Sequence, residues 1–190
     1  MAGEVSVFTG NGFEGFRAYM IRKTLFLTAL ALGCGLFAQH AQASEPKLLG
    51  TFGSWSAYVF LENGNKVCYM VAKPSRHQGN YKSRGDIFAL VTHRPAEGSR
   101  NVFSYSTGYT YKTNSEASVT IGARTFSLFT QDDMAWAPDS AQDNAITEAI
   151  KSGSSMMVKG TSSRGTATVD SFSLSGSTKA HEVISTECGV

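Results

Sequence analysis

The chain has 190 residues, and 17 Lys and Arg residues against 15 Asp and Glu residues give it a formal net charge of +2. This near-neutral balance excludes the strong basic excess that is typical of proteins that bind nucleic acids. Hydrophobic residues make up 42% of the chain, a share that is close to that of ordinary globular proteins and sufficient for one hydrophobic core.

The first predicted element in chain order is a secretory signal peptide. A short basic head at residues 20–23 precedes an apolar run at residues 24–37, and Ala41-Gln42-Ala43 forms a small-x-small cleavage site. Basic head, apolar core and cleavage site in this order are typical of a signal peptide that is removed on export. The apolar run is also shorter than the roughly 20 residues that a membrane-spanning helix needs.

We therefore expect translation to start at Met20 and cleavage to follow Ala43, with residues 1–43 as an N-terminal extension and signal peptide. Residues 44–190 then form a single domain, outside the cytoplasm and with no stable transmembrane segment. The sequence before Cys34 weakly resembles a lipoprotein box, which leaves lipid attachment at this cysteine as an alternative.

Two cysteines, Cys68 and Cys188, remain after this cleavage. In an oxidising compartment an isolated pair of cysteines predicts a disulfide bond. The alternative is a pair of buried free thiols. No CxxC motif occurs in the chain, so no motif supports a redox role of the thioredoxin type.

Most segments after the signal peptide have the composition and alternation of β-strands. The predicted strands are residues 55–60, 66–72, 87–93, 102–107, 118–121, 125–130, 156–161 and 166–174. Asn63-Gly64 lies between the first two strands and is a strong hairpin signal, whereas the polar residues 74–84 predict a loop. About eight short strands with regular turns predict an antiparallel sandwich or barrel.

Two segments have helical patterns. Asp139 is a good N-cap for the first helix, and Gln142 occupies the capping-box position three residues later. In the second, C-terminal segment, Ser177 is a candidate cap, and the apolar face includes Cys188. Docking of this face on the sheet would bring Cys188 to Cys68, so the helix and the disulfide predictions support each other.

The sequence carries none of the usual catalytic signatures. It has no HExxH, GxSxG or P-loop motif, and His77, His93 and His181 lack the spacing of metal ligands. We therefore expect no catalytic residue, no metal, no cofactor and no enzymatic activity. One alternative is an envelope hydrolase with an unrecognised site, which a cleft that gathers His93 with Asp86 or Asp170 would favour. Another is a structural or stress-protection protein with no specific ligand.

Charged residues are unevenly distributed along the chain. The basic residues between positions 73 and 100 are Lys73, Arg76, Lys82, Arg84, Arg94 and Arg100. Residues 125–150 carry five acidic side chains and no Lys or Arg. This distribution indicates either two ordinary solvated faces or a basic patch for an anionic envelope polymer or a protein partner. Arg84-Gly85-Asp86 also spells the tripeptide RGD, which some cell-surface receptors recognise.

Several short motifs, in their order and spacing, resemble those of the invasion-associated locus B family. They are residues 53–58 (GSWSAY), 66–70 (KVCYM), 84–86 (RGD), 91–95 (VTHRP), 135–138 (AWAP), 158–166 (VKGTSSRGT) and 188–189 (CG). The resemblance covers residues 48–190. Within these motifs we choose Trp136, Arg84, Arg94 and Arg164 as candidate binding residues.

The resemblance implies an exported protein of Gram-negative alphaproteobacteria, located in the periplasm, at the outer membrane or outside the cell. It also implies an antiparallel immunoglobulin-like β-sandwich, here with one inserted helix and a short C-terminal helix. The founding members of the family are associated with the entry of a pathogen into host cells. The family has no established catalytic residues, so the resemblance implies a protein that acts by binding an unidentified protein or envelope polymer.

Overall fold

The computed structural model describes residues 44–190, and the predicted signal peptide, the start at Met20 and Cys34 all lie outside these residues. The strands are β1 Lys47–Phe52, β2 Trp55–Glu62, β3 Asn65–Ala72, β4 Arg76–Gly79, β5 Phe88–Arg94, β6 Ser99–Ser106, β7 Glu116–Ile121, β8 Arg124–Gln131, β9 Met134–Trp136, β10 Ser155–Thr161 and β11 Ala167–Ser173. The helices are the short 3-10 helix η1 Pro95–Glu97, α1 Ser140–Ser152 and α2 Ser177–Cys188.

All eight predicted strands are present, as β2, β3, β5, β6, β7, β8, β10 and β11. Three further strands, β1, β4 and β9, were not predicted. The prediction of a loop over residues 74–84 was wrong in its first half, because β4 lies there and pairs with β11. All four residues of β4 are exposed and none has an apolar side chain, so its sequence lacks the apolar alternation by which a strand is recognised.

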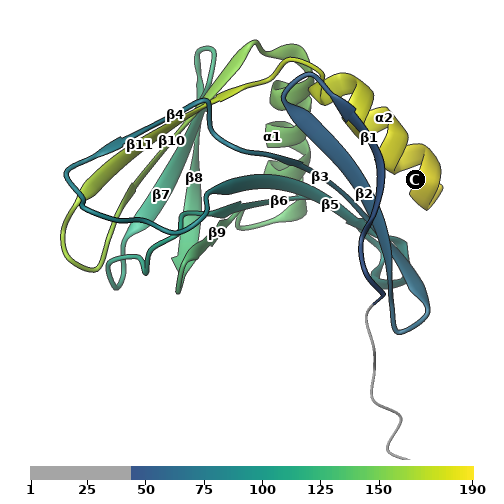
Figure 1. The fold of residues 1–190 in the computed structure, drawn as a ribbon, viewed down its shortest axis with the longest axis horizontal. Coiled ribbons are helices and arrows are strands. Elements are labelled where there is room, and N and C mark those ends of the chain that lie inside the picture. The colour runs from purple at the N-terminus through teal and green to yellow at the C-terminus, as the bar shows by residue number, and fades with distance from the viewer. Residues whose placement is uncertain (1–43) are drawn as a thin grey trace, which may run out of the picture. The chain divides into compact units, whose positions relative to one another are not determined.

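The strands form a single antiparallel sheet in the described residues, with the order β1-β2-β3-β5-β6-β9-β8-β7-β10-β11-β4 (Figure 1). Strand pairing therefore shows one open sheet and not the two separate sheets of the expected immunoglobulin-like sandwich. The difference comes from β9, a strand of only three residues that pairs with β6 on one side and with β8 on the other. The domain is mainly β, as predicted.

Side chains from distant strands of this sheet meet in one core. Tyr105 of β6 packs edge-on against Phe172 of β11, with 6.2 Å between the ring centroids, although four strands separate β6 from β11 in the sheet order. Trp55 of β2 is fully buried, and its indole N–H donates to the carbonyl of Ser173 at 3.1 Å. These buried aromatic contacts connect β2 and β6 with β11, which lies near the other edge of the sheet.

The helices begin differently from each other. The side chain of Asp139 accepts a hydrogen bond from the backbone N–H of Gln142 at 2.8 Å, which confirms the predicted cap of α1. The predicted cap of α2 was wrong: its N-cap is Gly176, at φ 87°. The hydroxyl of Ser177 instead donates to the carbonyl of Ile150 at 2.9 Å and so connects the two helices.

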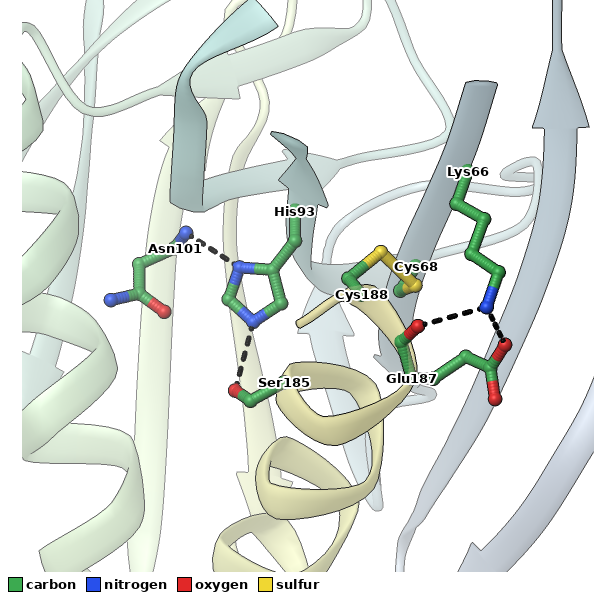
Figure 2. Close-up of a disulfide and its surroundings, with 7 residues drawn as sticks. All are labelled: Lys66, Cys68, His93, Asn101, Ser185, Glu187 and Cys188. Carbon is green, nitrogen blue, oxygen red and sulfur yellow. Dashed lines mark hydrogen bonds and ion pairs between the residues drawn. A yellow bond between two sulfur atoms is a disulfide. The ribbon is translucent and has the colours of Figure 1, made fainter. Parts of the chain in front are cut away.

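Helix α2 packs on β1, β2, β3 and β5. The predicted disulfide is confirmed at its C-terminal end, where Cys188 is bonded to Cys68 of β3 with 6.0 Å between the Cα atoms (Figure 2). The bond ties the last helix to β3, the third strand from the β1 edge of the sheet. In residues 44–190, no helix has both the length and the apolar character needed to cross a membrane.

Candidate functional site

A cavity of about 860 Å³ lies where three loops meet. Its walls come from residues 80–85 between β4 and β5, residues 108–110 after β6, and residues 162–168 at the β10–β11 hairpin. Figure 1 shows β4, β10 and β11 side by side at this end of the sheet. The volume falls in the range of roughly 300–1,000 Å³ that is usual for ligand pockets, so we take this pocket as the candidate site.

Backbone hydrogen bonds hold the three loops in place. The N–H of Ser163 donates to the carbonyl of Thr110 at 2.7 Å, and the N–H of Gly85 donates to the carbonyl of Gly108 at 2.9 Å. Gly108 has φ 70°, and a Cβ atom there would lie 2.4 Å from the carbonyl oxygen of Gly85. Only glycine allows this close approach. The pocket therefore has a shape that the backbone sets before any ligand binds.

The walls of the pocket are polar and positively charged. Lys82 and Arg164 are exposed on two different loops, and neither forms an ion pair with another residue between positions 44 and 190. Hydroxyl side chains line much of the remaining wall: Ser83, Thr110, Ser162, Ser163, Thr166 and Thr168. Among the described residues, no Asp or Glu lines this pocket. The pocket thus suits a polar ligand that carries negative charge.

Arg84 lies in the wall of the pocket, but its charge is compensated from within the protein. Its side chain is 4% exposed and that of Asp170 is 1% exposed. The two Nη atoms of Arg84 donate to the two carboxylate oxygens of Asp170 at 2.8 and 2.7 Å, and Nε donates to the carbonyl of Thr107 at 2.6 Å. The hydroxyl of Tyr105 also donates to Asp170. The candidate binding residue Arg84 is therefore part of a buried network beneath the pocket.

The pKa values of this network follow from its burial. Burial alone would lower the pKa of Arg84, but the hydrogen bond with Asp170 and the neighbouring negative charge outweigh it, so the pKa is raised. Burial raises the pKa of Tyr105, and the charge of Asp170 raises it further. Arg84 thus stays charged and Tyr105 stays protonated over the whole physiological pH range.

The other candidate binding residues lie in different places. Arg164 occupies the tip of the β10–β11 hairpin and lines the same pocket as Arg84. Arg94 lies elsewhere, at the end of β5, and forms an ion pair with Glu62. Trp136 of β9 stacks on Phe129 with 5.6 Å between the ring centroids. The structure therefore brings together two of the four candidates, and the binding roles of Arg94 and Trp136 stay predictions.

The basic residues of positions 73–100 are only partly brought together: Lys73, Lys82 and Arg84 line one smaller cavity, whereas Arg94 lies at the far end of β5. Lys73 pairs with Asp86 at 3.6 Å, and Arg84 is buried, so the RGD tripeptide does not present its arginine side chain at the surface. Lys82 lines the pocket; the sequence analysis placed it in the basic run of positions 73–100 but did not choose it as a candidate binding residue. Only the folded structure shows that Lys82 lines the same pocket as Arg164 of the β10–β11 hairpin.

A second group of polar residues surrounds His93, close to the disulfide (Figure 2). Nδ1 of His93 accepts a hydrogen bond from the backbone N–H of Asn101 at 3.0 Å, so the ring proton of the neutral histidine is assigned to Nε2. Nε2 lies 3.2 Å from the hydroxyl oxygen of Ser185. A base that activates a serine needs an unprotonated nitrogen towards the hydroxyl, and this tautomer offers a proton instead.

Among residues 44–190, no hydrogen bond or ion pair joins His93 to Asp86 or Asp170. Asp170 is bonded to Arg84, Asp86 lies beside Lys73, and His93 contacts Ser185. Within the described part of the chain, no group of three His, Cys, Asp or Glu side chains is placed to hold a metal ion.

We expect the stability of the protein to fall as the pH is lowered from about 6.5 to about 4. His93 is 1% exposed, and burial, together with the nearby His181, lowers its pKa to about 4. Between these pH values the unfolded chain binds a proton that the folded chain does not, so unfolding becomes more favourable. At about 1.4 kcal/mol for each pH unit, the loss in free energy of unfolding approaches about 3 kcal/mol.

Urea unfolding at several pH values measures this loss. The matched variant is His93→Gln, which keeps a polar side chain but cannot titrate. Its stability should change less than that of the parent protein between pH 6.5 and pH 4. Equal pH profiles for the two proteins would show that His93 is not the group responsible.

The fold and the site define a mainly β domain with a disulfide and a preformed cationic pocket, and the disulfide is in keeping with a protein outside the cytoplasm. The chain belongs to the Invasion associated locus B (IalB) protein family, whose model matches residues 55–185. This range contains the three loops of the pocket and all strands except β1. The comparison confirms the resemblance found in the sequence. No curated protein and no solved structure matches the chain.

Proposed function

We propose that the protein acts in the cell envelope by binding an anionic partner in the pocket between Lys82 and Arg164, and not by catalysis. The observation that carries this proposal is the pocket itself, where two cations that pair with no other residue of positions 44–190 face a cavity whose described lining has no carboxylate. Such a cavity attracts negative charge, and its hydrogen-bonding groups are already in position.

Family membership and the disulfide support a location outside the cytoplasm. The signal peptide expected to end at Ala43 would deliver the protein to the periplasm, from where it acts there, at the outer membrane or as a secreted protein. In a pathogen, retention of an envelope polymer or protein by this domain would contribute to the entry of the bacterium into host cells.

We expect the variant Lys82→Gln/Arg164→Gln to lose most of its capture of envelope material. A hydrogen bond to a charged group contributes about 1.5–3 kcal/mol, and about 1.4 kcal/mol corresponds to a tenfold change in affinity. Losing both cations should therefore reduce capture at least about tenfold. The measurement is a pull-down of envelope extract on immobilised protein at low and high salt.

The control is the variant Lys179→Gln/Arg124→Gln, which removes the same charge from exposed positions outside the pocket. It should capture as much material as the parent protein. If both variants lost capture equally, net charge and not the pocket would be responsible, and the proposal would fail.

A further inference from the structure

We infer that the ligand of this pocket is an acidic glycan, a sugar chain that bears carboxylate or phosphate groups. This inference rests on the proposed binding function and names the class of ligand. It follows from three properties of the pocket walls: what side chains they lack, what hydroxyl and aromatic groups they offer, and how the two cations are placed.

The walls lack the aliphatic anchors that commonly hold a protein partner, and the aromatic residues in their described lining are Tyr81 and Tyr109. In the described part of the chain, the pocket is lined by no Leu, Ile, Val, Met, Phe or Trp side chain. Protein partners are usually held by a few apolar or aromatic side chains that fill dry pockets in the centre of an interface. A sugar chain has no such side chain to bury, so the absence of aliphatic groups from the wall does not reduce its binding free energy.

The walls offer the groups that a sugar can use. Four of the Ser and Thr residues in the wall are exposed or half-buried, and their hydroxyls can donate to and accept from the hydroxyls of a sugar ring: Ser83, Thr110, Ser163 and Thr166. Tyr81 and Tyr109 add aromatic surface, whose electron-rich faces attract the C–H groups on the face of a sugar ring. Both phenol oxygens already have hydrogen-bond partners within the protein. The hydroxyl of Tyr81 lies 2.6 Å from Nδ1 of His77, and the hydroxyl of Tyr109 lies 2.6 Å from Oγ1 of Thr168.

These contacts fix the two rings before a ligand arrives. The guanidinium carbon of Arg84 lies 4.8 Å from the centroid of the Tyr109 ring and 5.6 Å from that of the Tyr81 ring. Since Arg84 is itself held by Asp170, the rings rest on a rigid buried network. A site whose side chains are locked by their neighbours loses little entropy on binding.

The two cations explain why the sugar should be acidic. Arg164 can form two parallel hydrogen bonds with a carboxylate or phosphate, and Lys82 can donate to the same kinds of group. The cations come from different loops of the pocket wall. A chain that repeats its negative charge from one sugar to the next can therefore form ion pairs with both, while a neutral sugar can accept hydrogen bonds from them but cannot neutralise their charge.

The test is calorimetric titration of the exported protein, purified from the periplasm of expressing cells. The probes are an oligogalacturonate, a phosphorylated glucan oligosaccharide, a neutral malto-oligosaccharide and an oligoglutamate peptide of matched length. The first two distinguish carboxylate from phosphate as the charged group. The protein variants are Lys82→Gln/Arg164→Gln and its control Lys179→Gln/Arg124→Gln.

We expect at least one of the two acidic sugars to bind at least about tenfold more tightly than the neutral sugar and the peptide, and to weaken with salt. Binding should fall at least about tenfold in the Lys82 and Arg164 variant and stay unchanged in the control. An oligoglutamate that binds as tightly as the acidic sugars would overturn the inference in favour of an acidic peptide.

The inference and the proposed function can fail separately. If neither acidic sugar binds while envelope capture still depends on Lys82 and Arg164, the glycan is wrong and the binding function stands. If envelope capture is also independent of these two residues, both are wrong.

Discussion

Replacing Asp170 by Asn should lower the free energy of unfolding by about 3–5 kcal/mol. The substitution keeps the shape of the side chain but leaves the charge of Arg84 buried without its partner, and an unpaired buried charge has a cost of this size. The Arg84 and Asp170 side chains are 4% and 1% exposed, so water cannot replace the lost carboxylate. Urea unfolding at neutral pH, followed by circular dichroism, measures the change.

Two comparisons show whether the buried charge is the cause. The double variant Arg84→Met/Asp170→Leu removes both charges and should be more stable than Asp170→Asn, because no unpaired charge remains. Asp86→Asn breaks the exposed pair with Lys73 and should change the stability by less than about 1 kcal/mol. If Asp170→Asn were as mild as Asp86→Asn, the ion pair would not be the support beneath the pocket that its geometry indicates.

Removing the disulfide should lower the free energy of unfolding by about 4–5 kcal/mol. The bond joins residues that are 120 positions apart, and a crosslink that closes a loop of roughly this length restricts the unfolded chain by about that amount. The variant Cys68→Ala/Cys188→Ala and the reduced parent protein should show the same loss. The measurement is urea unfolding in the presence and absence of a reducing agent.

The reducing agent itself is controlled for by the same variant, whose stability should not respond to it. We also expect α2 to exchange its amide hydrogens faster in the variant, since this helix has no side-chain cap and the bond anchors its last turn. A variant as stable as the oxidised parent would show that packing of α2 alone holds the C-terminus in place.

Local patterns made much of the fold predictable. Asn63-Gly64 forms the expected hairpin turn, with φ of 53° and 78°, because these residue types tolerate positive φ. Asp139 caps α1 as expected. The strands that were missed lack a local signal: β4 is polar and fully exposed, and β9 has only three residues. Without β9, the sequence suggests two sheets where the structure has one.

The candidate site was far less predictable, because it depends on contacts between distant parts of the chain. Arg84 was chosen as a candidate binding residue, and its burial follows from an ion pair with Asp170, which lies 86 residues away in the sequence. Arg164 and Lys82 were assigned separately to a motif and a basic run. Loop residues carry no periodic pattern that shows which other loop they will face.

The residue beneath the pocket and the charged residues of its wall differ in how well they tolerate substitution. Arg84 at the base of the pocket forms hydrogen bonds with Asp170 and Tyr105 in the core. A substitution of Arg84 would therefore lower the free energy of unfolding of the whole domain. Lys82 and Arg164 lie on exposed loops and form no ion pair with another residue of positions 44–190. Loops of this kind tolerate changes that the scaffold beneath them does not. Substitutions at a few positions of the pocket wall can therefore change the ligand specificity of this domain during evolution without changing its fold.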